Sequence, residues 1–288
     1  EVSDIANLAL PYSGLYIGLG GWLSPPQLVT AMIEEALQSG KLTLKPNHTY
    51  VSHEAVETTK QQVQIRFNLD SAESEEVITA DHLILALGAG AVNASNFNSL
   101  SLRPVRGQVE AIPTQMPIEQ LNTVLCHKGY MTPVFEGRHA LGSTYVKNDL
   151  STDARSDETE MNLATHEQAL ANTDIVQALQ HDGKARAATR LGSPDHQPVV
   201  GALHNFDSLK ELYTMLGVGK PLTSAPVLPS SVVSTLTCLG SRGLTTAPLM
   251  AEVLVSSLCK EPLPLSNDLL NAVNTSRFMT REAIRSQG

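Results

Sequence analysis

The sequence contains 288 residues, 42% of them hydrophobic, which is enough for one large domain or two interleaved ones. Charged residues make up 17% and the formal net charge is −9, and no basic run of the kind that marks nucleic-acid-binding proteins is present. The nearest approach to one is the scatter of Lys184, Arg186 and Arg190. Any contact with RNA must therefore be local or use a part of the protein outside this sequence.

The three cysteines (Cys126, Cys238 and Cys259) lie far apart, and neither they nor the nine histidines show the spacing of metal ligands. We interpret the cysteines as reduced thiols in or near a core, and we expect no metal. The sequence shows no signal peptide and no stretch approaching the roughly 20 apolar residues of a membrane helix. We therefore expect a cytoplasmic protein that has no membrane partner.

The first predicted element is a helix over residues 25–39, because Ser24 and two prolines precede apolar residues at helical spacing and Gly40 follows them. Short apolar runs then predict strands at 42–44, 50–52 and 63–67. The run 77–87 predicts a longer strand that ends at Gly88. Its continuously apolar second half is typical of a strand buried on both faces.

The middle of the sequence is rich in short strands and turns. Strands are predicted at 105–112, 129–135 and 139–145, which favours an antiparallel sheet in a separate substrate-side layer. Helices are predicted at 157–170 and at 174–179. A further helix is predicted after Asp207, a residue type that caps helix starts.

A last β-then-α unit is predicted over 232–259, with its strand at 232–239 and its turn at 240–243. The tail after Pro262 is predicted to be short and packed on the surface. Because α/β segments at both ends enclose a β-rich middle, the sequence predicts an α/β plus α+β fold in which one domain interrupts the other. The predicted limits are 1–95, 96–182 and 183–288.

Glycine-rich turns are the first candidates for chemistry. None completes the G-x-G-x-x-G pattern of a dinucleotide site, and those at 18–23, 88–93 and 217–221 are explained as ordinary tight turns. The turn at 239–248 is more specific, because it follows a buried strand and opens a helix. Free amides and the helix dipole there favour an anion or a ring that gains negative charge. A purely structural turn explains this spacing equally well.

Arg190 stands next to a tight turn, where a guanidinium can hold a carboxylate through two parallel hydrogen bonds. The simpler interpretation is a surface arginine paired with Asp195. Asp195 and His196 also suggest a catalytic dyad. No G-x-S-x-G serine accompanies them, so the sequence disfavours hydrolase chemistry.

Several segments, taken together and in order, resemble the FAD-dependent oxidoreductase half of the bacterial tRNA 5-methylaminomethyl-2-thiouridine biosynthesis bifunctional protein. That half is similar to glycine oxidase and D-amino-acid oxidase. The segments that carry the resemblance are GGWLSP at 20–25, PVRGQV at 104–109, GYMTP at 129–133, GSTY at 142–145, Arg190 with DHQPVVG at 195–201, LGSRGLTTAPL at 239–249, and PLPL at 262–265 with RF at 277–278. Each segment is weak alone, and their common order makes the resemblance specific.

The resemblance implies an FAD-binding Rossmann-like domain, formed by residues 1–95 and 183–288 and lacking its first βαβ unit, that is interrupted by an antiparallel-sheet substrate domain at 96–182. It implies FAD as cofactor and a tRNA with a modified wobble uridine as substrate. Hydride transfer to the flavin and hydrolysis would remove a carboxymethyl group as glyoxylate. Arg190 would clamp the substrate carboxylate, and Tyr130 would close the site. Cofactor contacts would come from Gly88, the main chain of Val51, and Gly240, Ser241, Arg242, Gly243, Leu244 and Thr245.

The resemblance also implies parts that this sequence does not contain. The G-x-G-x-x-G unit and a methyltransferase domain that uses S-adenosylmethionine would both precede Glu1. Since the first residue is not Met, we interpret the sequence as a fragment or a processed product. Two other functions stay open. One is an oxidase of a small free amine such as glycine or sarcosine, and the other is an inactive fragment that binds nothing.

Overall fold

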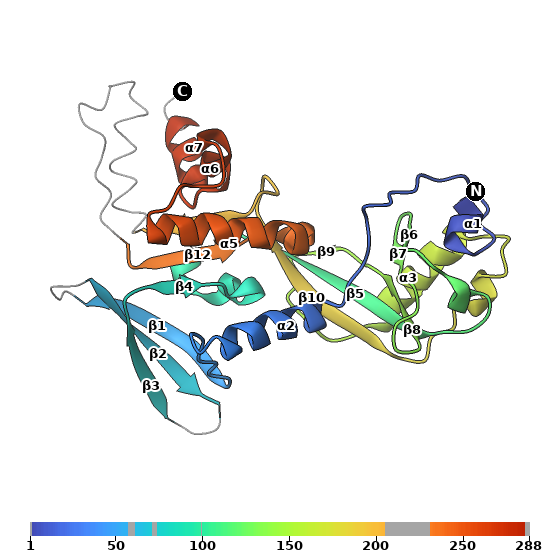
Figure 1. Cartoon of the computed structure of the whole chain (residues 1–288), viewed down its shortest axis with the longest axis horizontal. Coiled ribbons are helices and arrows are strands. Elements are labelled where there is room, and N and C mark those ends of the chain that lie inside the picture. The colour runs from blue at the N-terminus through green and yellow to red at the C-terminus, as the bar shows by residue number, and fades with distance from the viewer. Residues whose placement is uncertain (1, 57–60, 71–73, 99, 205–230, 286–288) are drawn as a thin grey trace. The chain divides into compact units, whose positions relative to one another are not determined.

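The computed structural model describes residues 2–56, 61–70, 74–98, 100–204 and 231–285. The chain forms two compact units, each made of two stretches (Figure 1). The first unit contains Glu1–Ala31 and Pro104–Arg190, and the second contains Met32–Arg103 and Leu191–Gly288. The predicted domain limits, after residues 95 and 182, each precede a change of unit, and the function assigned to each stretch stays a prediction. The helix predicted after Asp207 lies outside the described residues.

The first unit is built on a six-stranded sheet with the order β10-β5-β8-β7-β6, in which β9 also pairs with β5. Its strands are β5 (Arg103–Pro113), β6 (Leu125–Cys126), β7 (Tyr130–Met131), β8 (Arg138–Gly142), β9 (Val146–Lys147) and β10 (Ala185–Gly192). Antiparallel pairing of β5 with β8 and of β8 with β7 confirms the predicted antiparallel sheet. The strands predicted at 129–135 and 139–145 are shorter than expected, because Pro133 has no amide to donate and the chain leaves β8 after Gly142 to form β9.

Helix α3 (Ser156–Ala169) covers one face of this sheet and confirms the helix predicted at 157–170. Along β5 the even-numbered Gln108, Glu110 and Ile112 are buried, whereas Val109 and Ala111 are only half-buried. Gln108 and Glu110 form hydrogen bonds with Thr159 and Asn162 of α3. Alternation along the strand therefore directs the even-numbered side chains of β5 toward α3.

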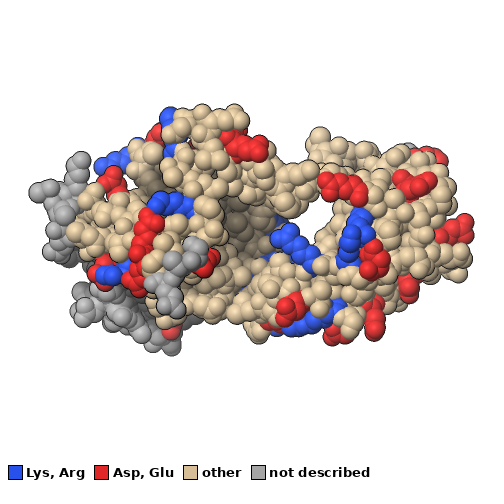
Figure 2. Space-filling view, turned by 90° about the horizontal axis from the view of Figure 1, so that it is seen from below, with Lys and Arg blue, Asp and Glu red and all other residues tan. Residues whose placement is uncertain are grey.

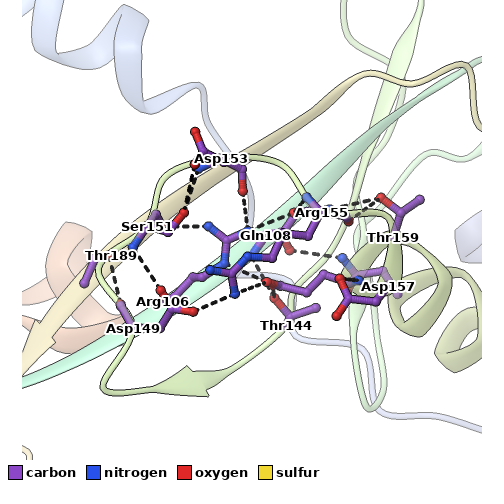
Figure 3. Close-up of polar contacts among 12 residues, drawn as sticks. Arg106, Gln108, Thr144, Asp149, Ser151, Asp153, Arg155, Asp157, Thr159 and Thr189 are labelled. Atoms are coloured by element: carbon purple, nitrogen blue, oxygen red, sulfur yellow. Dashed lines mark hydrogen bonds and ion pairs between the residues drawn. The ribbon is translucent and has the colours of Figure 1, made fainter.

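Polar side chains fill part of the layer between β5 and α3 (Figure 3). Arg106 is fully buried, and its Nε donates to Glu158 Oε1 at 2.6 Å. Its other nitrogens donate to the carbonyl oxygens of Ser151 and Asp153, both at 2.6 Å, and to Gln108 Oε1 at 3.1 Å. Because these donors all have partners, the guanidinium is held in one orientation and its burial is compensated.

An apolar core completes the first unit. It joins the sheet to the segment after α3 and to the chain just after α1 (Val2–Ala6). Its buried members are Ala6, Leu8, Ile112, Ile118, Leu121, Met131, Leu141, Leu170, Ile175, Ala178 and Leu179. The helix predicted at 174–179 is wrong, because only a single 3₁₀ turn, η4 (Val176–Ala178), forms before the chain bends at Gly183, whose φ is +89°.

The second unit contains two three-stranded sheets. The first is an antiparallel meander of β1 (His48–Val56), β2 (Gln62–Leu69) and β3 (Glu75–Ala80). The second has the order β11-β12-β4, from β11 (Val199–Ala202), β12 (Val233–Thr237) and β4 (Leu83–Leu85). Strand β12 runs parallel to β4 and antiparallel to β11.

Two strand predictions in this unit are corrected. Residues 42–44 form no strand. The run 77–87 is not one strand, because the polar pair Asp81 and His82 ends β3 and the chain enters a different sheet at β4. Ile84 is 44% exposed, so β4 is not buried on both faces as expected. The helix predicted at 25–39 is confirmed as α2 (Pro25–Gln38).

Three helices follow β12: α5 (Gly243–Cys259), α6 (Asn267–Val273) and α7 (Arg277–Arg285). Met250, Val253 and Leu254 of α5 pack with Val200 of β11 and Val273 of α6 in a core cluster. The tail after Pro262 is therefore not a short surface segment but two helices that contribute to the core. Among the described residues, none of the helices is both long and apolar enough to cross a membrane.

Candidate functional site

Arg190 lies near the end of β10 in the first unit, where it is half-buried. Its Nη2 donates to Ser143 Oγ at 2.8 Å, and its guanidinium carbon lies 6.0 Å from the centre of the Tyr145 ring. Within the described chain, Arg190 has no carboxylate at ion-pairing distance. The interpretation of Arg190 as a partner of Asp195 is therefore wrong, and its charge is available to an anion from outside.

Gly107 makes the room in which the Arg190 guanidinium lies. A Cβ atom at Gly107 would stand 2.6 Å from both Nη1 and Nη2 of Arg190 and 2.8 Å from its Cζ. No real Cβ contact is that short, so any side chain at residue 107 would displace the guanidinium. The glycine, together with Ser143, fixes where the positive charge of Arg190 is presented.

Tyr130 belongs to β7 and lies opposite Gly142 of β8, which in turn lies opposite Val109 of β5. Burial raises the pKa of the Tyr130 phenol, and the positive charge of Arg190 partly opposes that rise. The two predicted catalytic residues therefore lie on neighbouring parts of one unit, and the phenol stays protonated at neutral pH. A role for Tyr130 in closing the site stays a prediction.

The hairpin that carries Tyr130 packs against α3 through a pair of histidines. The rings of His127 and His166 lie 4.6 Å apart, edge to face, and His166 is fully buried. Burial and, to a smaller extent, the neighbouring His127 lower the pKa of His166 to about 4, against an opposing contribution from the Gly142 carbonyl. His166 is therefore neutral at physiological pH, and it supports the hairpin without adding charge to it.

Asp195 binds the carboxy-terminal helix rather than Arg190. Arg277 donates to both of its carboxylate oxygens, from Nε at 3.1 Å and from Nη2 at 2.9 Å, and Arg281 Nη1 donates at 2.7 Å. Burial would raise the pKa of Asp195, but hydrogen bonds from Arg277, Arg281 and Ser193 outweigh it and hold the pKa well below its usual range. The segment containing Asp195 and His196 therefore anchors α7. Because the Asp195 carboxylate is bound by two arginines, it is not available to act with His196 as a catalytic dyad.

Apart from Val51, the predicted cofactor residues of the second unit gather at one edge of a sheet. Because β4 and β12 are parallel neighbours, their carboxyl ends lie side by side, and Thr235 Oγ1 donates to the Leu85 carbonyl at 2.7 Å. Gly88 and Gly240 follow these ends with φ values of +55° and +57°, and each opens a 3₁₀ turn, η1 (Gly88–Asn93) and η5 (Gly240–Arg242). A Cβ atom at either glycine would meet nothing within 4 Å, so the backbone is open to a ligand at both.

The turn at Gly240 leads directly into α5, whose first amides carry no side-chain cap. Ser241, Arg242, Leu244 and Thr245 are exposed, and Gly243 is half-buried. The hydroxyl of Thr245 donates to the Arg242 carbonyl at 2.8 Å, so its proton is not offered to a ligand. An exposed, uncapped helix start at the carboxyl edge of parallel strands favours groups with negative charge.

Val51 occupies an irregularity in β1. The pairing register with β2 shifts between Tyr50 and Ser52, so Val51 is the extra residue of a bulge and is 45% exposed. A bulge leaves main-chain groups outside the ladder, which is compatible with the predicted main-chain contact to adenine.

Charged groups form no extended field in the view of Figure 2, where blue and red side chains lie in small groups separated by uncharged surface. Cys238 is buried and its thiol pKa is raised to about 11 by burial, whereas Cys126 and Cys259 are exposed, so only one of the three cysteines lies in a core as predicted. In the described part of the chain, no three His, Cys, Asp or Glu side chains are placed to hold a metal ion.

Comparison with protein families decides the class. The model of a family described as "FAD dependent oxidoreductase" matches residues 1–257. The chain belongs to this family. FAD is accordingly its cofactor, and the predicted oxidoreductase class is confirmed.

Two curated relatives are both named tRNA 5-methylaminomethyl-2-thiouridine biosynthesis bifunctional protein MnmC. The protein of Pseudoalteromonas atlantica is 45% identical over 298 residues, covering 100% of this chain and 42% of the relative. The protein of Aeromonas hydrophila is 35% identical over 288 residues, with the same coverage of 100% and 42%. The chain thus spans less than half the length of these relatives.

Solved structures support the predicted glycine oxidase-like fold class. Glycine oxidase from Geobacillus kaustophilus matches with a TM-score of 0.60 at 16% identity, over 86% of this chain and 57% of the oxidase. Iminodiacetate oxidase from a Chelativorans species matches with a TM-score of 0.60 at 17% identity, over 86% and 57%. At these identities the likeness shows the fold alone.

Sequence reasoning named Arg190 and Tyr130 but missed the residues that position Arg190. Gly107, Ser143 and Tyr145 all belong to segments that carry the family resemblance, and nothing in their local sequence ties them to residue 190. Knowledge of the pairing register of β5, β8 and β10 would have shown that these residues lie beside Arg190. That register depends on hydrogen bonds between strands far apart in the chain.

Proposed function

We propose that the chain performs the FAD-dependent removal of the carboxymethyl group from 5-carboxymethylaminomethyl-2-thiouridine at the wobble position of tRNA, which leaves 5-aminomethyl-2-thiouridine. One observation carries the proposal: relatives named for this uridine modification align with the entire chain, at up to 45% identity. The parent protein would then methylate the aminomethyl group with S-adenosylmethionine, and we place it in the cytoplasm, where tRNA is modified.

FAD supplies an acceptor for the hydride that leaves the carbon between the amine nitrogen and the carboxylate. Water then adds to the oxidised C–N bond, and the products are the primary amine and glyoxylate. Arg190 would hold the carboxylate by paired hydrogen bonds and so fix the position of the reacting carbon. Ser143 and Gly107 would hold the guanidinium in place, and Tyr130 would limit the access of water.

In the second unit, the edge formed by β4 and β12 would receive FAD. Gly88 and Gly240 leave space for close approach, and the uncapped start of α5 presents amides. The amides from Gly240 to Thr245 would stabilise negative charge at the pyrimidine edge of the ring, with Ser241, Arg242, Gly243 and Leu244 forming the turn. The main chain of Val51 would contact adenine.

The substitution Arg190→Ala tests the proposed clamp. Glyoxylate release from tRNA carrying the carboxymethylaminomethyl group should fall by at least about 100-fold, since a charged hydrogen-bonding group is lost, while flavin absorbance stays unchanged. Mass spectrometry of digested nucleosides measures the conversion directly. Unchanged turnover by the Arg190→Ala protein would exclude the role.

A free-amine oxidase is the second candidate, and the matches to glycine oxidase and iminodiacetate oxidase folds favour it. Iminodiacetate is a secondary amine that bears carboxymethyl groups, so an arginine clamp suits either substrate. Hydrogen peroxide formed from glycine, sarcosine or iminodiacetate, without activity on tRNA, would identify this function. A purified protein that stays colourless after incubation with FAD and removal of the unbound flavin, and that has no activity, would indicate an inactive fragment.

A further inference from the structure

The face of the first-unit sheet opposite α3, here called the open face, has an unusual distribution of charge. Because Gln108 and Glu110 point toward α3, the odd-numbered Gly107, Val109 and Ala111 of β5 point to the open face. These residues have small or medium side chains, so longer side chains on neighbouring strands project beyond them.

Strand register places several basic residues on this face. Lys147 of β9 lies opposite Val105, and directly paired residues share a face. Arg190 contacts Gly107 and is therefore on the same face. Arg186 precedes Arg190 by four positions on β10, and the burial of Ala187 and Leu191 shows that the alternation is unbroken between them.

None of the six strands contributes an acidic side chain to this face. The six strands contain one carboxylate, Glu110, and it points toward α3. Arg138 also belongs to the open face, opposite Pro113, but it is neutralised by Asp182. Lys147 and Arg186 are exposed and, among the residues that the structure describes, have no ion-pairing partner.

We propose that Lys147 and Arg186 bind the backbone phosphates of the RNA loop on either side of the modified uridine whose carboxylate Arg190 holds. This inference rests on the proposed function. The amide of Ala111 bonds to the Lys184 carbonyl and Gly107 contacts Arg190, so along β5 Lys147 lies on one side of Arg190 and Arg186 on the other.

The dimensions and chemistry suit a single-stranded loop. Four residues of strand separate Arg186 from Arg190 by about 13 Å, so the cations reach past the reacting nucleotide to its neighbours. Tyr145 is 54% exposed beside Arg190 and offers a ring on which a base can stack. A small free amine has no use for these two cations, and the overall charge of −9 repels RNA elsewhere.

The test is charge reversal with RNA affinity as the readout. A fluorescein-labelled, unmodified anticodon stem-loop is titrated with the wild type, Lys147→Glu, Arg186→Glu and the double variant, and fluorescence anisotropy is measured at several salt concentrations. Each single variant should bind at least about tenfold more weakly. The glutamine variants Lys147→Gln and Arg186→Gln should each reduce the salt slope by about one. Lys41→Glu, an exposed lysine of the second unit, is the matched control and should bind like the wild type.

Turnover separates this proposal from the proposed function. The ratio of kcat/KM on modified tRNA to that on the free modified nucleoside should fall at least about tenfold in Lys147→Glu and Arg186→Glu. If the wild type turns over neither substrate, the proposed function fails. The stem-loop titration still tests whether Lys147 and Arg186 bind RNA. Affinities equal to that of Lys41→Glu would overturn it. So would variants that aggregate with unchanged affinity, since Lys147 and Arg186 would then only protect β9 and β10 from pairing with another chain.

Discussion

At the residue scale, Gly107 controls the position of Arg190 more directly than any polar contact does. The atoms that a Cβ at residue 107 would strike are the ends of a flexible side chain, Nη1 and Nη2. A methyl group there would move the guanidinium and leave the backbone in place. A substitution at residue 107 can therefore change the orientation of the Arg190 guanidinium with little change in the free energy of unfolding. Few buried positions allow these two effects to be separated.

We expect Gly107→Ala to raise KM for the carboxylate-bearing substrate by about 10- to 100-fold, since the charged hydrogen bonds from Arg190 would be misdirected. The free energy of unfolding should change by less than about 1 kcal/mol, and flavin absorbance should not change. Gly192→Ala is the control, because a Cβ there would meet only Arg103 O at 3.7 Å. A KM equal to that of the control would contradict the proposed position of the clamp.

The buried His166 predicts a pH-dependent stability. Its pKa is about 4 in the folded protein against 6.5 for an unperturbed histidine, so the unfolded chain takes up the proton first as the pH falls. The stabilisation is complete above pH 6.5 and is lost progressively between pH 6.5 and 4. From about pH 7.5 to pH 5, wild type should lose about 2 kcal/mol more unfolding free energy than His166→Gln, as measured by urea denaturation. Parallel pH profiles would show that His166 does not contribute.

Local sequence identified Arg190 as a candidate because an arginine next to a tight turn is informative by itself, whereas Tyr130 was identified only through the family resemblance. Ser143 and Gly107 were not identifiable in this way. Their relation to Arg190 exists only once β5, β8 and β10 are paired, and a shift by one residue would turn each of them to the other face.

At the scale of elements, the ion pairs of Asp195 join α7 to the start of β11. Arg277 is 5% exposed and also donates to the Gln197 carbonyl at 3.0 Å. The guanidinium carbon of Arg277 lies over the ring of Phe278, 4.3 Å from the ring centre. The carboxy-terminal helix is thus fixed by one buried arginine, with Arg281 as an outer partner.

Arg277→Ala should lower the free energy of unfolding by roughly 2–4 kcal/mol, because Asp195 and the Gln197 carbonyl would lose a buried donor. Arg281→Ala removes an arginine that contacts the same carboxylate but is 46% exposed, and it should cost less than about 1 kcal/mol. Chemical denaturation of both variants gives the comparison. Equal losses would mean that burial does not set the strength of this anchor.

The elements that the sequence predicted well have strong local signals, such as the Ser24-Pro25 start of α2 and the acidic first turn of α3. The run 77–87 was predicted as one strand because apolar residues stand on both sides of Asp81 and His82. That polar pair is the only local sign that the chain changes sheet there. The tail was underestimated because α7 is rich in arginine, and its burial depends on Asp195, 82 residues earlier in the chain.

At the scale of the whole molecule, the two units have separate hydrophobic cores, since no cluster of buried apolar residues combines members of both. The single tryptophan, Trp22, belongs to the first unit and contacts Phe135 there. Its fluorescence therefore reports the unfolding of one unit alone.

On heating, we expect the midpoint of Trp22 fluorescence to differ from that of far-UV circular dichroism, which averages over both units. Addition of FAD should raise the dichroism midpoint more than the fluorescence midpoint, because the predicted cofactor residues belong to the second unit. Trp22→Phe provides the baseline for fluorescence. Coincident midpoints that FAD shifts equally would show that the units unfold together.

The interruption of one fold by another was predictable from the alternation of α/β and β-rich segments. The membership of residues 1–31 was not. In that stretch the side chains that enter the first-unit core are few, Ala6 and Leu8 among the buried ones, and they leave no periodic pattern that points to either unit.

Leu85 and Thr235 are hydrogen-bonded although they lie 150 residues apart in the sequence, and this separation affects the order in which the protein can fold during synthesis. A nascent chain that has just emerged through β4 has no parallel partner for it until β12 leaves the ribosome. The whole of Pro104–Arg190 is translated in between and can collapse meanwhile. The edge predicted to receive FAD is therefore completed only after β12 has left the ribosome, so loading of the flavin should follow the synthesis of residues 233–237.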